Sequence, residues 1–276
     1  LLPLKSSWAQ VLAAGLVVTF PSLTGIFGYM FTSTSYGLAF LLTALALWLV
    51  QQPNKWYRLA ALGCLVFALG IYQAFVGLCA GLLVTVVIRR LLDGEDEKAV
   101  LRDGLGYILF LALALGLYYG LAQLALALTH QKLAGYATSG LAFSPLSLPA
   151  NALRAYRAFF SIFTGGTFSL VPTKLSRVLH GLLWLAAAIL LIIRVKAQKR
   201  DTLNLVLLVT ALVLFPLAVC CIYLFIAPAS IHTIVLYSVV DVYLLMLMLA
   251  DSCPPVTQLR RAVLNILPVL CALIVT

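Results

Sequence analysis

The sequence predicts an all-α, polytopic integral membrane protein, and three observations carry this prediction. Hydrophobic residues make up 64% of the chain and charged residues only 9%, whereas soluble domains carry about 25% charged residues. Several apolar runs reach the roughly 17–25 residues that a helix needs to cross a bilayer. The basic residues sit in short segments between these runs, so the net charge of +10 does not indicate a nucleic-acid surface.

Hydropathy predicts about eight to nine membrane segments in this chain. The expected spans, in chain order, are 8–26, 36–50, 59–88, 104–128, 178–194, 203–225, 233–250 and 262–276. No polar stretch is long enough to fold separately, so residues 1–276 are expected to form a single transmembrane domain. The six cysteines lack metal-ligand spacing, and we expect neither a metal nor a cofactor.

The basic residues predict which side of the membrane each segment occupies. Five segments hold 13 of the 18 Lys and Arg residues, and we expect them in the cytoplasm. The longest stretch between apolar runs, 129–177, is expected to be extracytoplasmic. It holds the remaining five basic residues: Lys132, Arg154, Arg157, Lys174 and Arg177.

The run 59–88 does not fit a simple alternation of sides. Segments 51–58 and 89–103 both read as cytoplasmic, so the chain between them crosses twice or not at all. Its length is too small for two full spans of about 20 residues. We therefore expect a short helical hairpin or a re-entrant segment that turns near Tyr72 and Gln73, with both side chains facing outward. The alternative is one long tilted helix in which Gln73 bonds to a neighbour.

The outer segment contains a predicted amphipathic helix, 149–164, lying along the outer leaflet. Leu153, Tyr156, Phe160 and Phe163 share one face, and Arg154, Arg157 and Ser161 share another. The two arginines either form a cationic fork for a lipid phosphate or snorkel to ordinary headgroups. Lys174 and Arg177, at the start of the next span, are further candidates for the same phosphate. His180 is expected to pack or hydrogen-bond within the bundle.

The carboxylates leave the chemistry open. None of the eight Asp and Glu residues lies in a predicted outer loop, so the chain offers no general base there. Asp241 lies in the middle of an expected span, where a carboxyl group is costly. It either hydrogen-bonds a neighbouring helix or has a catalytic or acceptor-positioning role.

Two stretches resemble a known family. PSLTGIFGYMFTSTSYGLAFLLTALALWL (21–49) and LGIYQAFVGLCAGLLV (69–84) are similar to the bacterial membrane glucosyltransferase II family. In that family a Y-M-F…Y segment is followed by a G-I-Y-Q-A segment at similar spacing. Its members include serotype-converting O-antigen glucosyltransferases of the inner (cytoplasmic) membrane. The resemblance is clearest over residues 20–90.

The resemblance implies a GT-C type helix bundle with its site at the outer face. It implies transfer of a hexose, with glucose expected, from a polyprenyl-phosphate donor to a cell-surface glycan. Arg154 and Arg157 would then bind the donor phosphate, and Tyr72 and Gln73 the sugar or acceptor. Tyr29 and Tyr36 border the preceding outer loop, where they either line the same cavity or belong to an interfacial belt of aromatic residues.

One feature of the family pattern is missing. In GT-C enzymes the base is usually an aspartate in the first outer loop, which is not identifiable here. We therefore expect that the chain begins after the first span or spans of the family and that the base lies upstream. Two other functions stay open: a flippase or transporter for lipid-linked glycans, and a non-catalytic membrane subunit. A transporter would need a polar path, but the spans offer little polarity beyond Asp241 and Gln123.

Overall fold

A computed structural model describes residues 2, 4–23, 25, 31, 33–130, 145–164, 173–197, 200–225 and 233–252. The regular structure in these ranges is helical, without a strand among them. Five of the described helices are long and apolar enough to cross a membrane. The predicted all-α membrane helix bundle is thereby confirmed, while the number of segments stays a prediction. Tyr29 and the expected span 262–276 lie outside the described residues.

The described elements follow one another along the chain in this order: α1 (Ser7–Thr19), α3 (Ser33–Val50), α4 (Lys55–Ile71), α5 (Phe75–Asp93), α6 (Glu97–Thr129), η2 (Pro145–Ser147), α8 (Leu148–Thr164), α9 (Lys174–Lys196), α10 (Thr202–Val219), η3 (Cys221–Leu224), η5 (Thr233–Val239) and α11 (Val240–Ser252). The five candidate spans are α3, α5, α6, α9 and α10.

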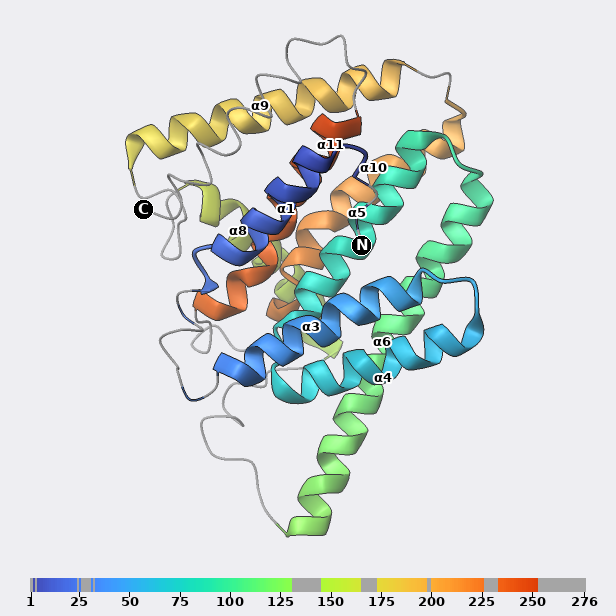
Figure 1. Ribbon diagram of the computed structural model, residues 1–276, viewed down its shortest axis with the longest axis vertical. Helices are drawn as coiled ribbons and strands as arrows, with labels where there is room; N and C mark the ends of the chain where they lie inside the picture. Colours follow the sequence, from blue (N-terminus) through green and yellow to red (C-terminus); the bar gives the residue numbers. More distant parts are fainter. Residues whose placement is uncertain are drawn as a thin grey trace.

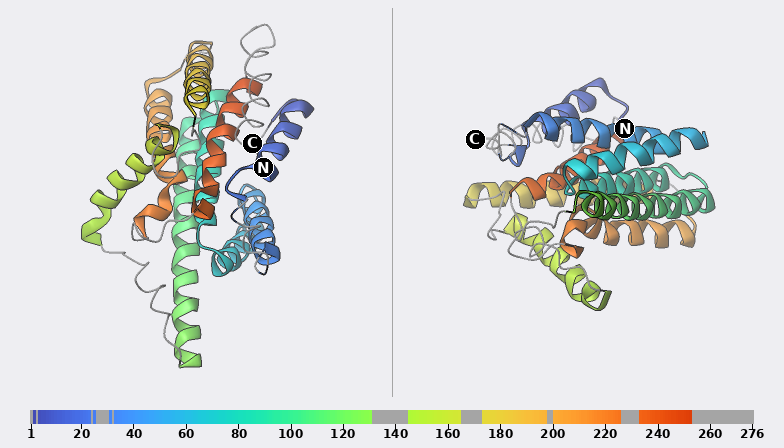
Figure 2. Two further views of the ribbon diagram at one scale, coloured as in Figure 1. Left: turned by 90° about the vertical axis from the view of Figure 1, so that its left-hand side faces the viewer. Right: turned by 90° about the horizontal axis from the view of Figure 1, so that it is seen from below.

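Helix α5 lies at the centre of the arrangement. It contacts α3, α6, α10, α11 and the short 3-10 helices η3 and η5 (Figure 1). Most of its side chains are buried. Helix α6 runs past the other helices and projects well beyond them, as Figures 1 and 2 both show. Most of its side chains are exposed, as expected of a helix that faces lipid.

The run predicted to double back is divided by a turn. Helix α4 ends at Ile71 and α5 begins at Phe75. The helices have 17 and 19 residues, about 26 and 29 Å long at 1.5 Å per residue. The two helices together extend beyond 59–88, because α4 begins before the apolar run and α5 ends after it, in the polar residues that flank the run. Helix α4 packs mainly against α3 and α6 rather than α5, and its place in a membrane stays a prediction.

Basic helix ends gather on one side of the molecule. In Figure 1 the basic last turns of α5 and α9 lie toward the right, as do the first turns of α4 and α6, which also carry Lys or Arg residues. The α4–α5 turn and the first turn of α9 lie toward the left. Side chains on the right cap helix N-termini, because Asn54, Asp96 and Asp201 each accept a bond from a backbone N–H of the helix that follows. The carboxylates of Asp96 and Asp201 thus have a structural role as helix caps.

The C-terminus of α5 is held by Arg200, which lies between α9 and α10. Arg200 donates to the carbonyl oxygens of Leu91, at 2.6 Å, and Leu92, at 2.9 Å. It also donates to the Asn204 side chain at 2.9 Å. A cation at this position satisfies carbonyl groups that the helix leaves unpaired and complements the helix dipole. Burial, and then the nearby Arg194, lower the pKa of Arg200, but an arginine stays charged in proteins.

Replacing Arg200 should loosen this junction. We expect Arg200→Ala to destabilise the protein by about 2 kcal/mol, because several carbonyl groups lose a charged donor. Arg200→Lys should recover only part of this, because one ammonium group cannot reach the same acceptors as the planar guanidinium. Thermal unfolding in detergent measures both. Lys196→Ala removes a nearby exposed cation and should change Tm little; an equal fall in Tm would attribute the effect to net charge.

Candidate functional site

Two glycines on one face of α5 bring other elements unusually close. Gly77 and Gly81 are four residues apart, the small-xxx-small spacing that lets helices approach in membranes. A Cβ atom at Gly77 would lie 2.8 Å from the carbonyl oxygen of Val219 and 3.1 Å from Ser238 Cβ. The Ser238 hydroxyl donates to the same Val219 oxygen at 2.7 Å. This face of α5 therefore packs against both the end of α10 and the 3-10 helix η5.

Asp241 lies one turn further along the same face. A Cβ atom at Gly81 would overlap Asp241 Oδ2 and lie 3.0 Å from Asp241 Cγ. The side chain is fully buried, and neither carboxylate oxygen has a hydrogen-bond partner among the residues that the structure describes. Gly81 is eight residues beyond Gln73, so Asp241 contacts α5 about 12 Å below the α4–α5 turn. The carboxyl group is packed between backbones and reaches no surface.

The predicted outer turn is held by aromatic and amide contacts. Tyr72 packs against Tyr36 with ring centroids 5.0 Å apart and against Phe75 at 6.0 Å. Gln73 is exposed, and its Nε2 donates to the hydroxyl of Tyr118 on α6 at 2.6 Å. The Gln73 amide therefore lies at the surface, in the turn that precedes α5, and is oriented by a residue of α6.

A row of aromatic rings leads from this turn into the bundle. Neighbouring centroids are between 5.0 and 6.3 Å apart along Tyr36, Tyr72, Phe75, Tyr237, Phe20 and Tyr243. At its inner end, the Tyr243 hydroxyl lies 2.8 Å from Nε2 of His180, whose Nδ1 lies 2.8 Å from the Ser176 carbonyl oxygen. Both ring nitrogens of His180 are thus used within the bundle, as expected from the sequence.

Helix α8 packs on the protein through a face that the sequence did not indicate. Asn151, Ala155, Phe159 and Ile162 are buried, and the helix contacts η3, α9 and α10. Leu153 and Phe160, from the predicted aromatic face, have 51% and 56% of their surface exposed. The buried face therefore mixes small and large residues, while Leu153 and Phe160 face outward.

The two arginines of α8 have different surroundings. Arg154 is half-buried and donates to the backbone carbonyl oxygen of Tyr223 in η3. Arg157 is exposed. Only Arg157 is fully available to a ligand from solvent, whereas the position of Arg154 is defined by η3.

Lys174 and Arg177 lie in the first turn of α9, where both are exposed. Thr173 caps this turn, and it exchanges hydrogen bonds with Ser176. Figure 1 places the first turn of α9 and the α4–α5 turn toward the same side of the view.

Sequence reasoning missed three contributors to this region: Gly81, Tyr118 and Tyr223. The small-xxx-small spacing from Gly77 to Gly81 was the one available signal. Nothing in the sequence pairs Gln73 with Tyr118, 45 residues later, because that contact depends on how α6 lies against the turn.

Comparison with known proteins gives one match. A sequence model described as glucosyl transferase GtrII matches residues 1–249. Searches of curated proteins and of solved structures find no match. The matched range includes the α4–α5 turn, all five candidate spans and Asp241. It also extends the resemblance seen around GIYQA to nearly the whole chain. The chain therefore belongs to the glucosyl transferase GtrII family.

Proposed function

We propose that this membrane glucosyltransferase moves a hexose, with glucose expected, from a polyprenyl-phosphate donor to an extracytoplasmic cell-surface glycan in the bacterial inner membrane. The reaction would take place at the outer end of a GT-C type bundle, around the α4–α5 turn. The lipid phosphate is itself the leaving group, so the proposal needs no metal.

The observation that carries the proposal is the exposed Gln73 at the start of the central helix. Its side chain is oriented by Tyr118 at 2.6 Å, and the ring of the preceding residue, Tyr72, packs against Tyr36. An amide and a hydroxyl held at fixed positions suit the hydroxyl groups of a sugar. The gathering of basic helix ends at the opposite side of the molecule supports an outward-facing turn, because basic segments favour the cytoplasm.

The remaining predicted residues receive roles that follow from their exposure. Arg157 would contact the donor phosphate, and Arg154 would contribute from its position beside η3. Lys174 and Arg177 are exposed cations available to the same anion. We assign Asp241 a packing role, because its carboxyl group is fully buried and touches α5. We expect the catalytic base to lie outside these residues.

The proposal is tested by turnover of a polyprenyl-phosphate hexose by the protein in membranes. Gln73→Ala should lower kcat/KM by about 10- to 100-fold, because a contact with the reacting sugar is lost. Tyr118→Phe keeps the ring but removes the hydroxyl that orients Gln73, and should cost about tenfold.

Tyr119→Phe is the matched control, since Tyr119 is the exposed neighbour of Tyr118 on α6 and should keep normal turnover. Normal rates for Gln73→Ala and Tyr118→Phe together would remove the turn from the active site. If the intact protein transferred no hexose from any polyprenyl phosphate but accepted a nucleotide sugar, the proposed donor would be wrong.

A further inference from the structure

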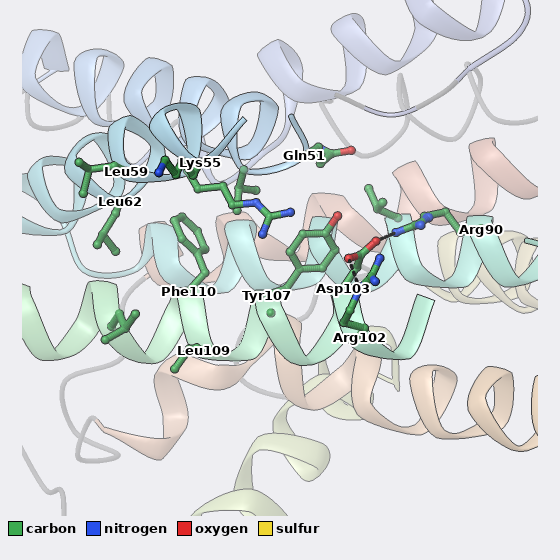
Figure 3. A pocket seen from close by; sticks show the side chains of 15 residues that line it. Gln51, Lys55, Leu59, Leu62, Arg90, Arg102, Asp103, Tyr107, Leu109 and Phe110 are labelled. Carbon is green, nitrogen blue, oxygen red and sulfur yellow. Dashed lines mark hydrogen bonds and ion pairs between the residues drawn. The ribbon is translucent and has the colours of Figure 1, made fainter. Parts of the chain in front are cut away.

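A cavity of about 890 Å³ lies beside the first turns of α4 and α6, and Figure 3 shows the side chains that line it. Residues of α3, α4, α5 and α6 line it. We propose that this cavity is a binding site for an anionic glycerophospholipid of the inner leaflet. The proposal rests on the cytoplasmic placement of segments 51–58 and 89–103, and it does not depend on the transferase reaction.

The charges lining the cavity are unbalanced. Its lining contains four cations, Lys55, Arg58, Arg90 and Arg102, and a single acid, Asp103. Arg90 donates to Asp103 at 2.9 Å and also pairs with Glu95 at 2.6 Å. Among the described residues, Lys55 and Arg58 have no ion pair, and both are exposed. The first turn of α4 therefore presents two cations without an ion pair among the described residues to a cavity whose other charges are largely paired. Figure 3 shows Lys55 beside Leu59.

The lining changes from charged to apolar along the helices. On α4 the order is Lys55, Arg58, Leu59 and Leu62; on α6 it is Arg102, Asp103, Tyr107, Phe110 and Leu113. Figure 3 shows Arg90, Arg102 and Asp103 at one end and Leu59 and Leu62 at the other. Residues 102 and 113 are separated by roughly 17 Å along α6. A cationic mouth above an apolar wall of this length matches a headgroup phosphate followed by an acyl chain.

Charge and position select the occupant. The cytoplasmic leaflet carries the negative surface potential that attracts basic segments, and basic pockets between membrane helices on that side bind anionic headgroups. A soluble phosphate would use the cations but gain nothing from Leu62, Phe110 and Leu113. A zwitterionic lipid would fit the wall but leave Lys55 and Arg58 without a net negative partner.

Gly106 allows the cavity to be filled without altering its charge. It lines the cavity, and a Cβ atom there would meet no atom within 4 Å. The Cβ atom of Gly106→Leu therefore enters open space, and the variant is designed to place the rest of the side chain in the cavity. Gly116 is also on α6 with open space around it but does not line the cavity. Gly116→Leu is the matched control for the change in helix propensity.

The experiment measures Tm and bound lipid, by native mass spectrometry, for delipidated protein in a neutral detergent. Phosphatidylglycerol at about a hundredfold excess over its Kd should raise Tm by roughly 5–10 °C. Phosphatidylcholine and inorganic phosphate should each raise it little. The variant carrying Lys55→Gln and Arg58→Gln should bind phosphatidylglycerol at least about tenfold more weakly, and Gly106→Leu should lose the bound lipid.

Control variants distinguish binding in the cavity from general electrostatic attraction of anionic lipid to exposed cations. Lys98→Gln removes an exposed cation near the start of α6 that does not line the cavity, and it should bind phosphatidylglycerol like the unaltered protein. An unchanged affinity in the Lys55→Gln and Arg58→Gln variant, or in Gly106→Leu, would overturn the proposal. Equal effects of phosphatidylglycerol and phosphatidylcholine would also overturn it. Tighter binding of a polyprenyl phosphate through the same residues would identify a carrier-lipid site in place of the phospholipid site.

Discussion

Gly81→Ala is expected to destabilise the protein by about 3 kcal/mol, the upper part of the range for overpacking a close-packed interior. The added methyl group would overlap Asp241 Oδ2 and press on Val219 Cγ2 at 3.0 Å. Since α11 also contacts α1, α9 and η5, it cannot move away from α5 without disturbing those contacts. Thermal unfolding should show Tm lower by roughly 10 °C.

A double-mutant cycle assigns this loss to the contact with Asp241. Asp241→Ala removes the overlapping carboxyl group, so Gly81→Ala should cost about 1–2 kcal/mol less in that background. Gly116→Ala, where the methyl group enters open space, should be neutral or stabilising by up to about 1 kcal/mol. Strictly additive effects of Gly81→Ala and Asp241→Ala would show that the two residues do not press on each other.

Arg157→Ala is expected to lower turnover of the polyprenyl-phosphate donor by about 10- to 100-fold, chiefly through KM, with Tm unchanged. Arg157 is exposed, so its loss removes a charge-assisted contact with the phosphate and leaves the fold intact. Arg157→Lys keeps the charge but not the two parallel hydrogen bonds of a guanidinium, and should recover only part of the loss. The measurement is the dependence of rate on donor concentration at matched amounts of folded protein.

Arg154 provides a contrasting case on the same helix. Arg154→Ala should lower both turnover and Tm, because Arg154 also donates to the Tyr223 carbonyl oxygen. Lys5→Ala, which removes an exposed cation far from α8 in sequence, should change neither. Near-normal KM in Arg157→Ala and in the variant that carries both Arg154→Ala and Arg157→Ala would mean that these arginines only meet ordinary lipid headgroups.

Much of the architecture could be predicted because hydropathy and charge act locally. The α4–α5 turn follows from two basic segments on either side of an apolar run too short for two spans, with Tyr72 and Gln73 near its middle. Helix α8 begins at Leu148, one residue before the expected start, directly after Ser147. Membership of the glucosyl transferase GtrII family was similarly visible in the GIYQA stretch, which is short but distinctive.

Contacts between helices were less predictable. Asp96 and Asp201 looked like ordinary cytoplasmic acids, yet each caps a helix, which depends on where that helix begins. The fork expected from Arg154 and Arg157 assumed an isolated helix. The backbone of η3, which meets Arg154 from 69 residues away in the chain, makes the two side chains unequal.

The sequence by itself determined that this chain is a helical membrane protein of the glucosyltransferase family and which helix ends carry the positive charge. Only the tertiary structure decided that α5 is central, that Gly81 receives Asp241, and that Leu153 and Phe160 of α8 face outward. The physical reason lies in the solvent: lipid tails are as apolar as a protein interior, so hydropathy locates a span without indicating which face meets protein. That choice depends on shape, through small residues such as Gly77 that allow backbones to approach, and shape is a property of the packed helices together.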